Sequence, residues 1–169
     1  MSKNSNIILI GFMASGKTYV GHELSRLTGK TMLDTDALIE ETSGQKISDI
    51  FQTQGELCFR DLETDVTRSL SGYKDTIIST GGGIILRQEN RELLKEAGLV
   101  FLLWSTPEKT LERVQDDNSR PLLNVTNKLQ KIRKMLSDRE SFYRGTADFI
   151  MDSDNNSIEE LASKILKLV

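Results

Sequence analysis

The segment GFMASGKT at 11–18 carries residue types and a spacing that bind phosphate, and it follows the apolar run IILI. The pattern G-x-x-x-x-G-K-S/T is matched by Gly11, Gly16, Lys17 and Thr18. Glycines let backbone N–H groups converge on phosphate oxygens, and the start of the next helix adds its dipole. The lysine would reach the β- and γ-phosphates, and the threonine hydroxyl would bind Mg²⁺. The motif predicts a bound nucleoside triphosphate.

We expect the loop as a whole to contact the nucleotide. Ala14 stands where many small kinases carry another glycine. Because alanine disfavours positive φ, we expect position 14 to lie outside the left-handed region. The predicted nucleotide-binding residues of this loop are Gly11, Ala14, Ser15, Gly16, Lys17, Thr18 and Tyr19.

Two aspartates occur in the segment TMLDTD, where Asp34 ends a short predicted strand and Asp36 follows two residues later. Mg²⁺ is usually held by one or two carboxylates together with waters. The strands at 76–79 and 100–104 end without an acid, so Asp34 is the best candidate to hold the metal with Thr18. Asp36 is then available to orient an acceptor hydroxyl and take its proton. The local alternative, in which Asp34 only ends the strand and Asp36 only caps a helix, stays open.

Short apolar runs alternate with longer amphipathic stretches along the chain. This alternation predicts βαβ units and a parallel sheet with helices on both faces. Ligands of such sheets bind at the carboxyl ends of the strands, where the residues above lie. We expect strands at 7–10, 31–34, 76–79, 100–104 and 148–151, and helices at 17–28, 56–71, 87–97, 107–116, 128–143 and 157–168.

Length and composition limit the possibilities further. A chain of 169 residues suits a single domain over 1–169. The net charge of −3 gives no electrostatic reason to expect a nucleic-acid partner. A single cysteine, Cys58, cannot form an internal disulfide, and no apolar stretch reaches membrane-spanning length. We therefore expect a cytoplasmic protein with no membrane partner.

Other proteins with such a loop fit the sequence less well. A guanine-nucleotide switch needs N-K-x-D, but the nearest match at 127–130 reads NKLQ and lacks the aspartate. The D-x-x-G pattern of these switches does not occur in the sequence. A motor or large ATPase needs an aspartate that closes a hydrophobic strand, and more chain. Small-molecule kinases remain.

A set of further motifs makes the interpretation more specific. The segments GFMASGKT, LDTD, GELCFRDLE, STGGG, NSRPLL and DRESFYR resemble those of shikimate kinases, in the same order and over essentially the whole chain. The resemblance implies a nucleoside-monophosphate-kinase-like fold of three layers, with a five-stranded parallel sheet in the order 2-3-1-4-5. It also implies Mg·ATP-dependent phosphorylation of the 3-hydroxyl of shikimate, on the route to chorismate and the aromatic amino acids, by an enzyme that we expect to be a monomer.

The resemblance also implies which residues bind the acceptor. Arg60 and Arg139 would bind its carboxylate, because a guanidinium donates two parallel hydrogen bonds. Glu63 follows Arg60 by one helical turn and is placed to hold it, although such a pair alone is more often a surface ion pair. The amide of Gly82 would donate to the substrate. The implied substrate-binding residues are Asp36, Phe51, Phe59, Arg60, Gly81, Gly82, Gly83 and Arg139, and a helical segment at about 36–63 carries several of them.

The segment at about 115–127 is the predicted mobile lid. Its Arg120 is expected to close over the phosphates and to act in catalysis with Lys17 and Asp36. Arg113 matches a position that stacks on adenine in the family, and Asn155 is its expected partner in adenine binding. The segment DSDNNS at 152–157 departs from the arginine and proline of many relatives.

Two alternatives to a shikimate kinase also have such a phosphate-binding loop. One is a gluconate-type sugar-acid kinase, against which the glycine triplet and the two arginines argue. The other is a non-catalytic nucleotide-binding module, which would have no need of an acceptor site.

Overall fold

The computed structural model describes residues 5–114 and 126–169 of the chain. The strands are β1 (Ile7–Ile10), β2 (Thr31–Asp34), β3 (Thr76–Ser79), β4 (Leu99–Trp104) and β5 (Phe149–Asp152). The helices are α1 (Lys17–Thr28), α2 (Thr35–Ser43), α3 (Ile47–Thr53), α4 (Gly55–Ser69), α5 (Gln88–Ala97), α6 (Pro107–Val114), α7 (Lys128–Thr146) and α8 (Ile158–Leu166), with 3₁₀ turns η1 (Leu70–Gly72) and η2 (Ile84–Leu86). No helix in the described ranges is long and apolar enough to cross a membrane.

The strands form a five-stranded parallel sheet in the order β2-β3-β1-β4-β5. The central strand β1 pairs on both sides: Ile8 lies opposite Ile78 of β3 and Val100 of β4. Each of the five strands predicted from the sequence is present, with its ends shifted by no more than one residue. The predicted strand order is confirmed.

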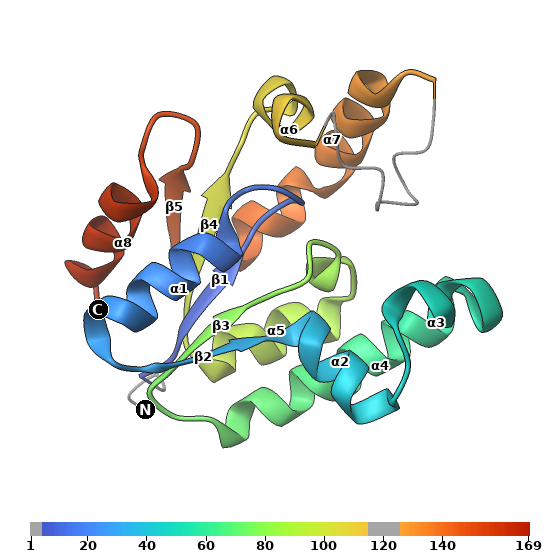
Figure 1. Ribbon diagram of the computed structural model, residues 1–169, viewed down its shortest axis with the longest axis horizontal. Coiled ribbons are helices and arrows are strands. Elements are labelled where there is room, and N and C mark those ends of the chain that lie inside the picture. The colour runs from blue at the N-terminus through green and yellow to red at the C-terminus, as the bar shows by residue number, and fades with distance from the viewer. Residues whose placement is uncertain (1–4, 115–125) are drawn as a thin grey trace.

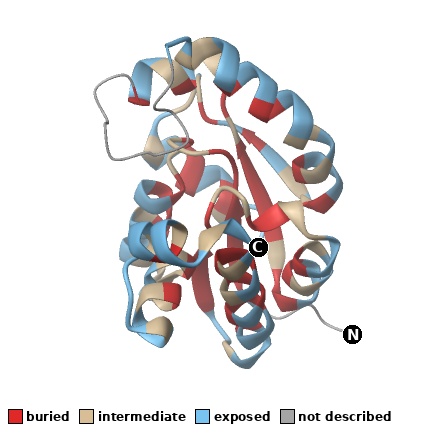
Figure 2. Ribbon diagram, turned by 90° about the vertical axis from the view of Figure 1, so that its right-hand side faces the viewer, coloured by how far each residue is buried: buried red, intermediate tan, exposed pale blue. Residues whose placement is uncertain are grey.

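Helices cover both faces of the sheet and complete three layers (Figure 1). Alternate side chains of a strand point to opposite faces, so β1 contributes to two cores. Ile7 and Leu9 pack with side chains of α1 and α8. Ile8 and Ile10 pack with side chains of α5 and α7. Because both faces are covered, the inner strands β1, β3 and β4 are buried along almost their whole length, whereas the edge strands β2 and β5 are more exposed. Figure 2 shows buried strands beneath helices whose outer sides are exposed.

Helices α2, α3 and α4 form a separate group beyond β2 (Figure 1). Their own small core contains Ile39, Ile50, Phe59 and Val66. Helices α2 and α3 are both absent from the individual helices predicted above, because nine and seven residues are too few for a clear amphipathic period. The group as a whole corresponds to the predicted helical segment at about 36–63.

The side chain of Asn6 joins three strands at the amino-terminal end of the sheet. Its Nδ2 donates to the carbonyls of Tyr73 (2.8 Å) and Ala97 (2.9 Å), and its Oδ1 accepts from the N–H of Thr76 (3.0 Å). The residue is 1% exposed. One buried amide therefore satisfies the first N–H of β3 and carbonyls that precede β3 and β4.

We predict that Asn6→Ala destabilises the fold strongly, by about 2–4 kcal/mol, because it leaves buried backbone donors and acceptors without partners. Urea unfolding at equilibrium measures the loss. Gln52→Ala, which removes an exposed side-chain amide from α3, is the control and should change the free energy of unfolding by less than about 0.5 kcal/mol. Equal stability of the two variants would contradict the role given to Asn6.

Candidate active site

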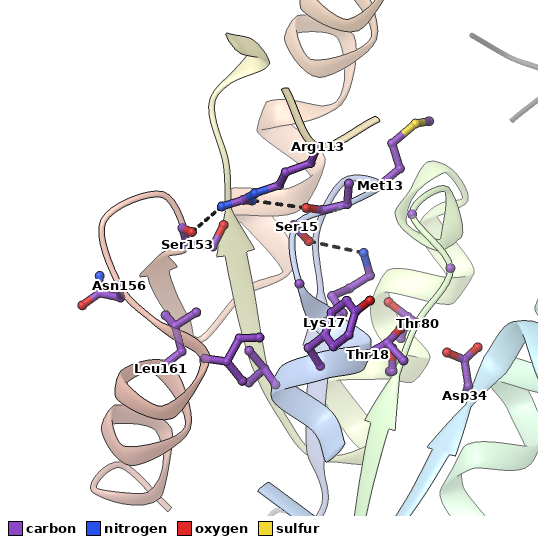
Figure 3. Close-up of a pocket in the computed structure, with 18 of the residues that line it drawn as sticks. Met13, Ser15, Lys17, Thr18, Asp34, Thr80, Arg113, Ser153, Asn156 and Leu161 are labelled. Atoms are coloured by element: carbon purple, nitrogen blue, oxygen red, sulfur yellow. Dashed lines mark hydrogen bonds between the residues drawn. The ribbon is translucent and has the colours of Figure 1, made fainter. Parts of the chain in front are cut away.

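A pocket of about 880 Å³ opens at the carboxyl edge of the sheet, where the phosphate-binding loop, the ends of β2 and β3 and the start of α8 meet (Figure 3). The loop after β1 forms one wall, and Asp34 and Asp36 lie on the wall beside it. The residues that line the pocket include Met13, Ala14, Ser15, Gly16, Lys17, Thr18, Tyr19, Asp34, Asp36, Thr80, Gly81, Gly82, Arg113, Ser153, Asn156, Ser157 and Leu161.

The loop at 11–18 wraps tightly before α1. Gly11 has φ of 152° and Gly16 has φ of 93°, values that L side chains rarely adopt. Ala14 has φ of 56°, so our expectation that it lies outside the left-handed region is wrong. The physical reason is the closed turn of the loop, in which the carbonyl of Ala14 accepts a hydrogen bond from Arg113 Nη1 (3.2 Å). A left-handed alanine costs roughly 1–2 kcal/mol, which the loop tolerates.

Lys17 lies inside this loop. Its Nζ donates to the carbonyls of Gly11 (2.9 Å) and Phe12 (2.8 Å) and to Ser15 Oγ (3.4 Å). The residue is only 8% exposed, so its ammonium is held at the floor of the pocket. A cation in this place, at the first residue of α1, suits the phosphate groups that the motif predicts.

Thr18 and Asp34 both line the pocket (Figure 3) and supply the hard oxygen ligands that Mg²⁺ prefers. Asp34 also caps α2, because its Oδ1 accepts from the N–H of Asp36 (2.9 Å). The cap belongs to Asp34 and not to Asp36, which lies in the first turn of the helix. Within residues 5–114 and 126–169, no three His, Cys, Asp or Glu side chains lie close enough to bind a metal. The donors present therefore fit Mg²⁺ bound mainly by phosphates and water.

Asp36 is the acidic group best placed to meet an acceptor. Burial raises the pKa of its carboxyl to about 6, and the negative charge of Asp34 adds to the shift, while Lys17 and Arg60 oppose it. Its Oδ1 is buried and has no hydrogen-bond partner among the described residues. A buried carboxylate oxygen without a donor is costly, so it is a natural acceptor for a ligand hydroxyl.

Arg60 lies on α4 between two glutamates. Its Nη1 donates to Glu63 Oε2 (2.9 Å), and its Nε and Nη2 donate to Glu56 Oε1 (3.3 and 3.1 Å). Glu63 is 1% exposed, and its pKa is raised by burial although Arg60 acts to lower it. The predicted role of Glu63 in holding Arg60 thus has the expected geometry. The side chain of Glu56 is largely exposed and can give up its place to another carboxylate.

The glycine triplet after β3 touches three different parts of the site. A Cβ added to Gly81 would lie 2.6 Å from Asp36 Oδ1, and one on Gly83 would collide with Arg60 Nη1. A Cβ on Gly82 would lie 3.3 Å from the backbone nitrogen of Met13 in the phosphate-binding loop. None of the three has φ in the left-handed region. These glycines are therefore required by close approach and not by backbone conformation.

Arg139 and the predicted aromatic residues Phe51 and Phe59 do not line the pocket. The guanidinium of Arg139, on α7, lies 5.7 Å from the ring centre of Phe12. The rings of Phe51 and Phe59 are 4.7 Å apart, and the guanidinium of Arg60 lies 5.1 Å from the centre of the Phe59 ring. Phe59 belongs to the core of the α2–α4 group, and its ring packs against the guanidinium of Arg60.

Arg113 joins the two sides of the nucleotide pocket (Figure 3). Besides the bond to Ala14, its Nη2 donates to the carbonyl of Ser153 (2.7 Å) and its Nη1 to Ser105 Oγ (3.1 Å). Asn155 does not line the pocket, because its side chain donates to Asp152 Oδ2 (2.8 Å). The neighbouring Asn156 lines it instead.

Two residues of the site, Thr35 and Tyr143, are not among those predicted from the sequence, and the predicted Arg120 lies outside the described ranges. Thr35, between the two aspartates, and Tyr143, one helical turn after Arg139, both contact the glycine triplet. Their only sequence signal is that they lie within LDTD and DRESFYR. Arg120 and residues 115–125 of the predicted lid lie outside the described residues.

The comparisons with known proteins agree on one family. The family model described as shikimate kinase matches residues 13–169. A shikimate kinase of Acinetobacter baumannii (strain AYE) is 42% identical over 164 residues, which cover 97% of this chain and 91% of the relative. One from Chromobacterium violaceum is 38% identical over 161 residues, which cover 95% of this chain and 88% of the relative.

A solved structure resembles the whole chain closely. The structure of shikimate kinase from Acinetobacter baumannii in complex with shikimate superposes with a TM-score of 0.92 at 41% identity, over 99% of this chain and 93% of that one. The fold, the motifs and the full-length similarity all indicate the same family. The chain belongs to the shikimate kinase family.

Proposed function

We propose that this chain transfers the γ-phosphoryl group of ATP to the 3-hydroxyl of shikimate, and that the residues around the glycine triplet bind and orient the acceptor. The observation that carries the proposal is the close approach of this triplet to Asp36, the phosphate-binding loop and Arg60, each of which a Cβ added to one of the glycines would meet within 3.3 Å. A hydroxyl that reaches Asp36 from this side meets the phosphate end of the pocket. The arrangement therefore suits direct transfer between two bound molecules.

The donor side of the reaction depends on Lys17, Thr18 and Asp34. Lys17 is placed to neutralise charge on the transferred phosphoryl group. Thr18 and the oxygens of Asp34 would hold Mg²⁺, directly or through water. Bound there, the metal would offset the negative charge of the phosphate groups.

Asp36 acts on the acceptor. Its carboxylate accepts a hydrogen bond from the attacking hydroxyl and takes the proton as the new O–P bond forms and the bond to the leaving ADP breaks. Its raised pKa makes it a better proton acceptor than an exposed aspartate. Arg60 and Arg139 bind the carboxylate of the acceptor, with Glu63 holding Arg60 in place.

Several further features of this proposal come from the sequence. Arg120 closes over the phosphates from a lid at about 115–127, and Arg113 lies against the adenine, with Asn155 in the segment beside it. The chain acts as a single-domain cytoplasmic monomer without a nucleic-acid partner. The support for this is a length of 169 residues, a net charge of −3 and a single cysteine.

An assay that couples ADP release to a visible signal tests the function, with shikimate and gluconate compared in the same experiment. Turnover with shikimate alone supports the proposal. Turnover with gluconate instead would favour the sugar-acid kinase. ATP binding by the folded protein without turnover of either acid would favour a nucleotide-binding module.

We predict that Asp36→Asn lowers kcat by about 10²–10⁴-fold, because an amide cannot take the proton of the hydroxyl. ATP affinity, measured by calorimetry, should stay within about twofold, since Asp36 acts on the acceptor. Asp49→Asn, an exposed change of the same type on α3, is the control and should leave kcat unchanged. A kcat near the wild-type value for Asp36→Asn would remove this residue as the proton acceptor.

We predict that Arg139→Ala raises the KM for shikimate by roughly 10–100-fold, because two charge-assisted hydrogen bonds are lost. The KM for ATP should change much less. Arg139→Lys keeps the charge but loses the planar fork, so its shikimate KM should lie between those of the wild type and Arg139→Ala. Equal increases in both KM values would contradict a role in binding the carboxylate.

We predict that Gly83→Ala raises the KM for shikimate about tenfold or more, because the new Cβ must displace the guanidinium of Arg60. Gly145→Ala is the matched control. Gly145 lies near the end of α7 with no atom within 4 Å of an added Cβ, so this change should stabilise the fold by about 0.5 kcal/mol and leave KM unchanged. Unchanged shikimate kinetics in Gly83→Ala would show that the close approach to Arg60 is not needed.

A further inference from the structure

The glycine triplet has no side chains with which to hold its own position. Its approaches to Asp36 and Arg60 leave no room for an added carbon, and its approach to Met13 leaves little. A backbone that must keep such distances needs fixed anchor points, because glycine has the largest conformational freedom of any residue.

One anchor is Thr35, the first residue of α2. Its Oγ1 accepts a hydrogen bond from the N–H of Gly81 (3.0 Å), and the residue is completely buried. Thr35 stands directly before Asp36, so the same turn of helix carries the acceptor-facing carboxylate and the anchor. The bond therefore fixes Gly81 relative to Asp36.

The second anchor is Tyr143 on α7. Its phenolic hydroxyl donates to the carbonyl of Gly82 (2.5 Å), and the residue is 1% exposed. Burial raises the pKa of Tyr143, and the nearby Arg139 opposes that shift only in part, so the hydroxyl keeps its proton and remains a donor. Tyr143 thus lies between the triplet and the second carboxylate-binding arginine.

We propose that Thr35 and Tyr143 are positioning residues that together set the direction of the Gly82 amide toward the acceptor. Thr35 accepts a hydrogen bond from the N–H of Gly81, one residue before this amide. Tyr143 donates to the carbonyl of Gly82 itself, in the next peptide unit. Because peptide units are planar, fixing both groups restricts the orientation of the N–H between them. The two hydroxyls come from elements on opposite sides of the triplet, α2 and α7. The inference rests on the proposed function, since it assigns the Gly82 amide to the acceptor.

The test compares variants that remove one hydroxyl and keep the shape of the side chain. Thr35→Val and Tyr143→Phe should each raise the KM for shikimate about tenfold, while the KM for ATP stays within about twofold. Thr35→Ser, which keeps the hydroxyl, should restore the shikimate KM to within about threefold of the wild type. Tyr73→Phe, a partly buried tyrosine remote from the triplet, is the control and should leave both KM values unchanged.

Calorimetric titration with shikimate in the absence of ATP gives a second measurement, and thermal unfolding shows which variants are folded. Weaker shikimate binding with Thr35→Val and recovery with Thr35→Ser support the inference, whether or not Tyr143→Phe folds. Wild-type shikimate affinity in folded Thr35→Val overturns it, and so does an equal rise in both KM values. A wild-type protein without shikimate turnover would instead overturn the proposed function, so the two failures are distinguished.

Discussion

The parallel pairing of β1 with both β3 and β4 is the constraint on which the site depends. Parallel strands end at the same edge, so the loop after β1 and the loop after β3 leave the sheet side by side. One of these loops binds phosphate and the other is the glycine triplet. Their separation is thereby set by the spacing between neighbouring strands, about 4.8 Å, and not by flexible side chains. The buried amide of Asn6 stabilises the opposite end of the same strands.

The electrostatics of the site follow from burying charges at this edge. Asp36, Glu63 and Arg60 all lie away from bulk water, and burial alone would penalise each of them. Arg60 is compensated by Glu63 and Glu56, whereas Asp36 Oδ1 and Glu63 Oε1 have no hydrogen-bond partner in the described part of the chain. A substrate with hydroxyls and a carboxylate supplies the missing donors and an anion. These unpaired buried oxygens destabilise the free protein, and a bound substrate that pairs with them restores that stability.

The sequence predicted the sheet and the type of chemistry well, because both depend on local patterns. Five apolar runs, the phosphate-binding motif and the two aspartates are each readable within ten residues. What it could not predict are contacts between distant segments. The bond from Tyr143 to Gly82 joins residues 61 apart, and that from Asn6 to Thr76 joins residues 70 apart. Asn155 does not line the pocket in the structure, for a local reason: Asp152 accepts hydrogen bonds from the backbone and the side chain of Asn155.

The error at Ala14 shows how such distant contacts determine local backbone. Judged alone, an alanine should disfavour positive φ. In the structure, the carbonyl of Ala14 and that of Ser153 are both held by the guanidinium of Arg113. One side chain of α6 therefore links the phosphate-binding loop to the segment before α8, and Asp154 holds the start of α6 by accepting from the N–H and hydroxyl of Thr106. The strained backbone of Ala14 is thus accepted because it lets Arg113 join the two walls of the nucleotide pocket. In the same way, the glycine triplet gives up side chains so that the walls of the acceptor site can approach one another.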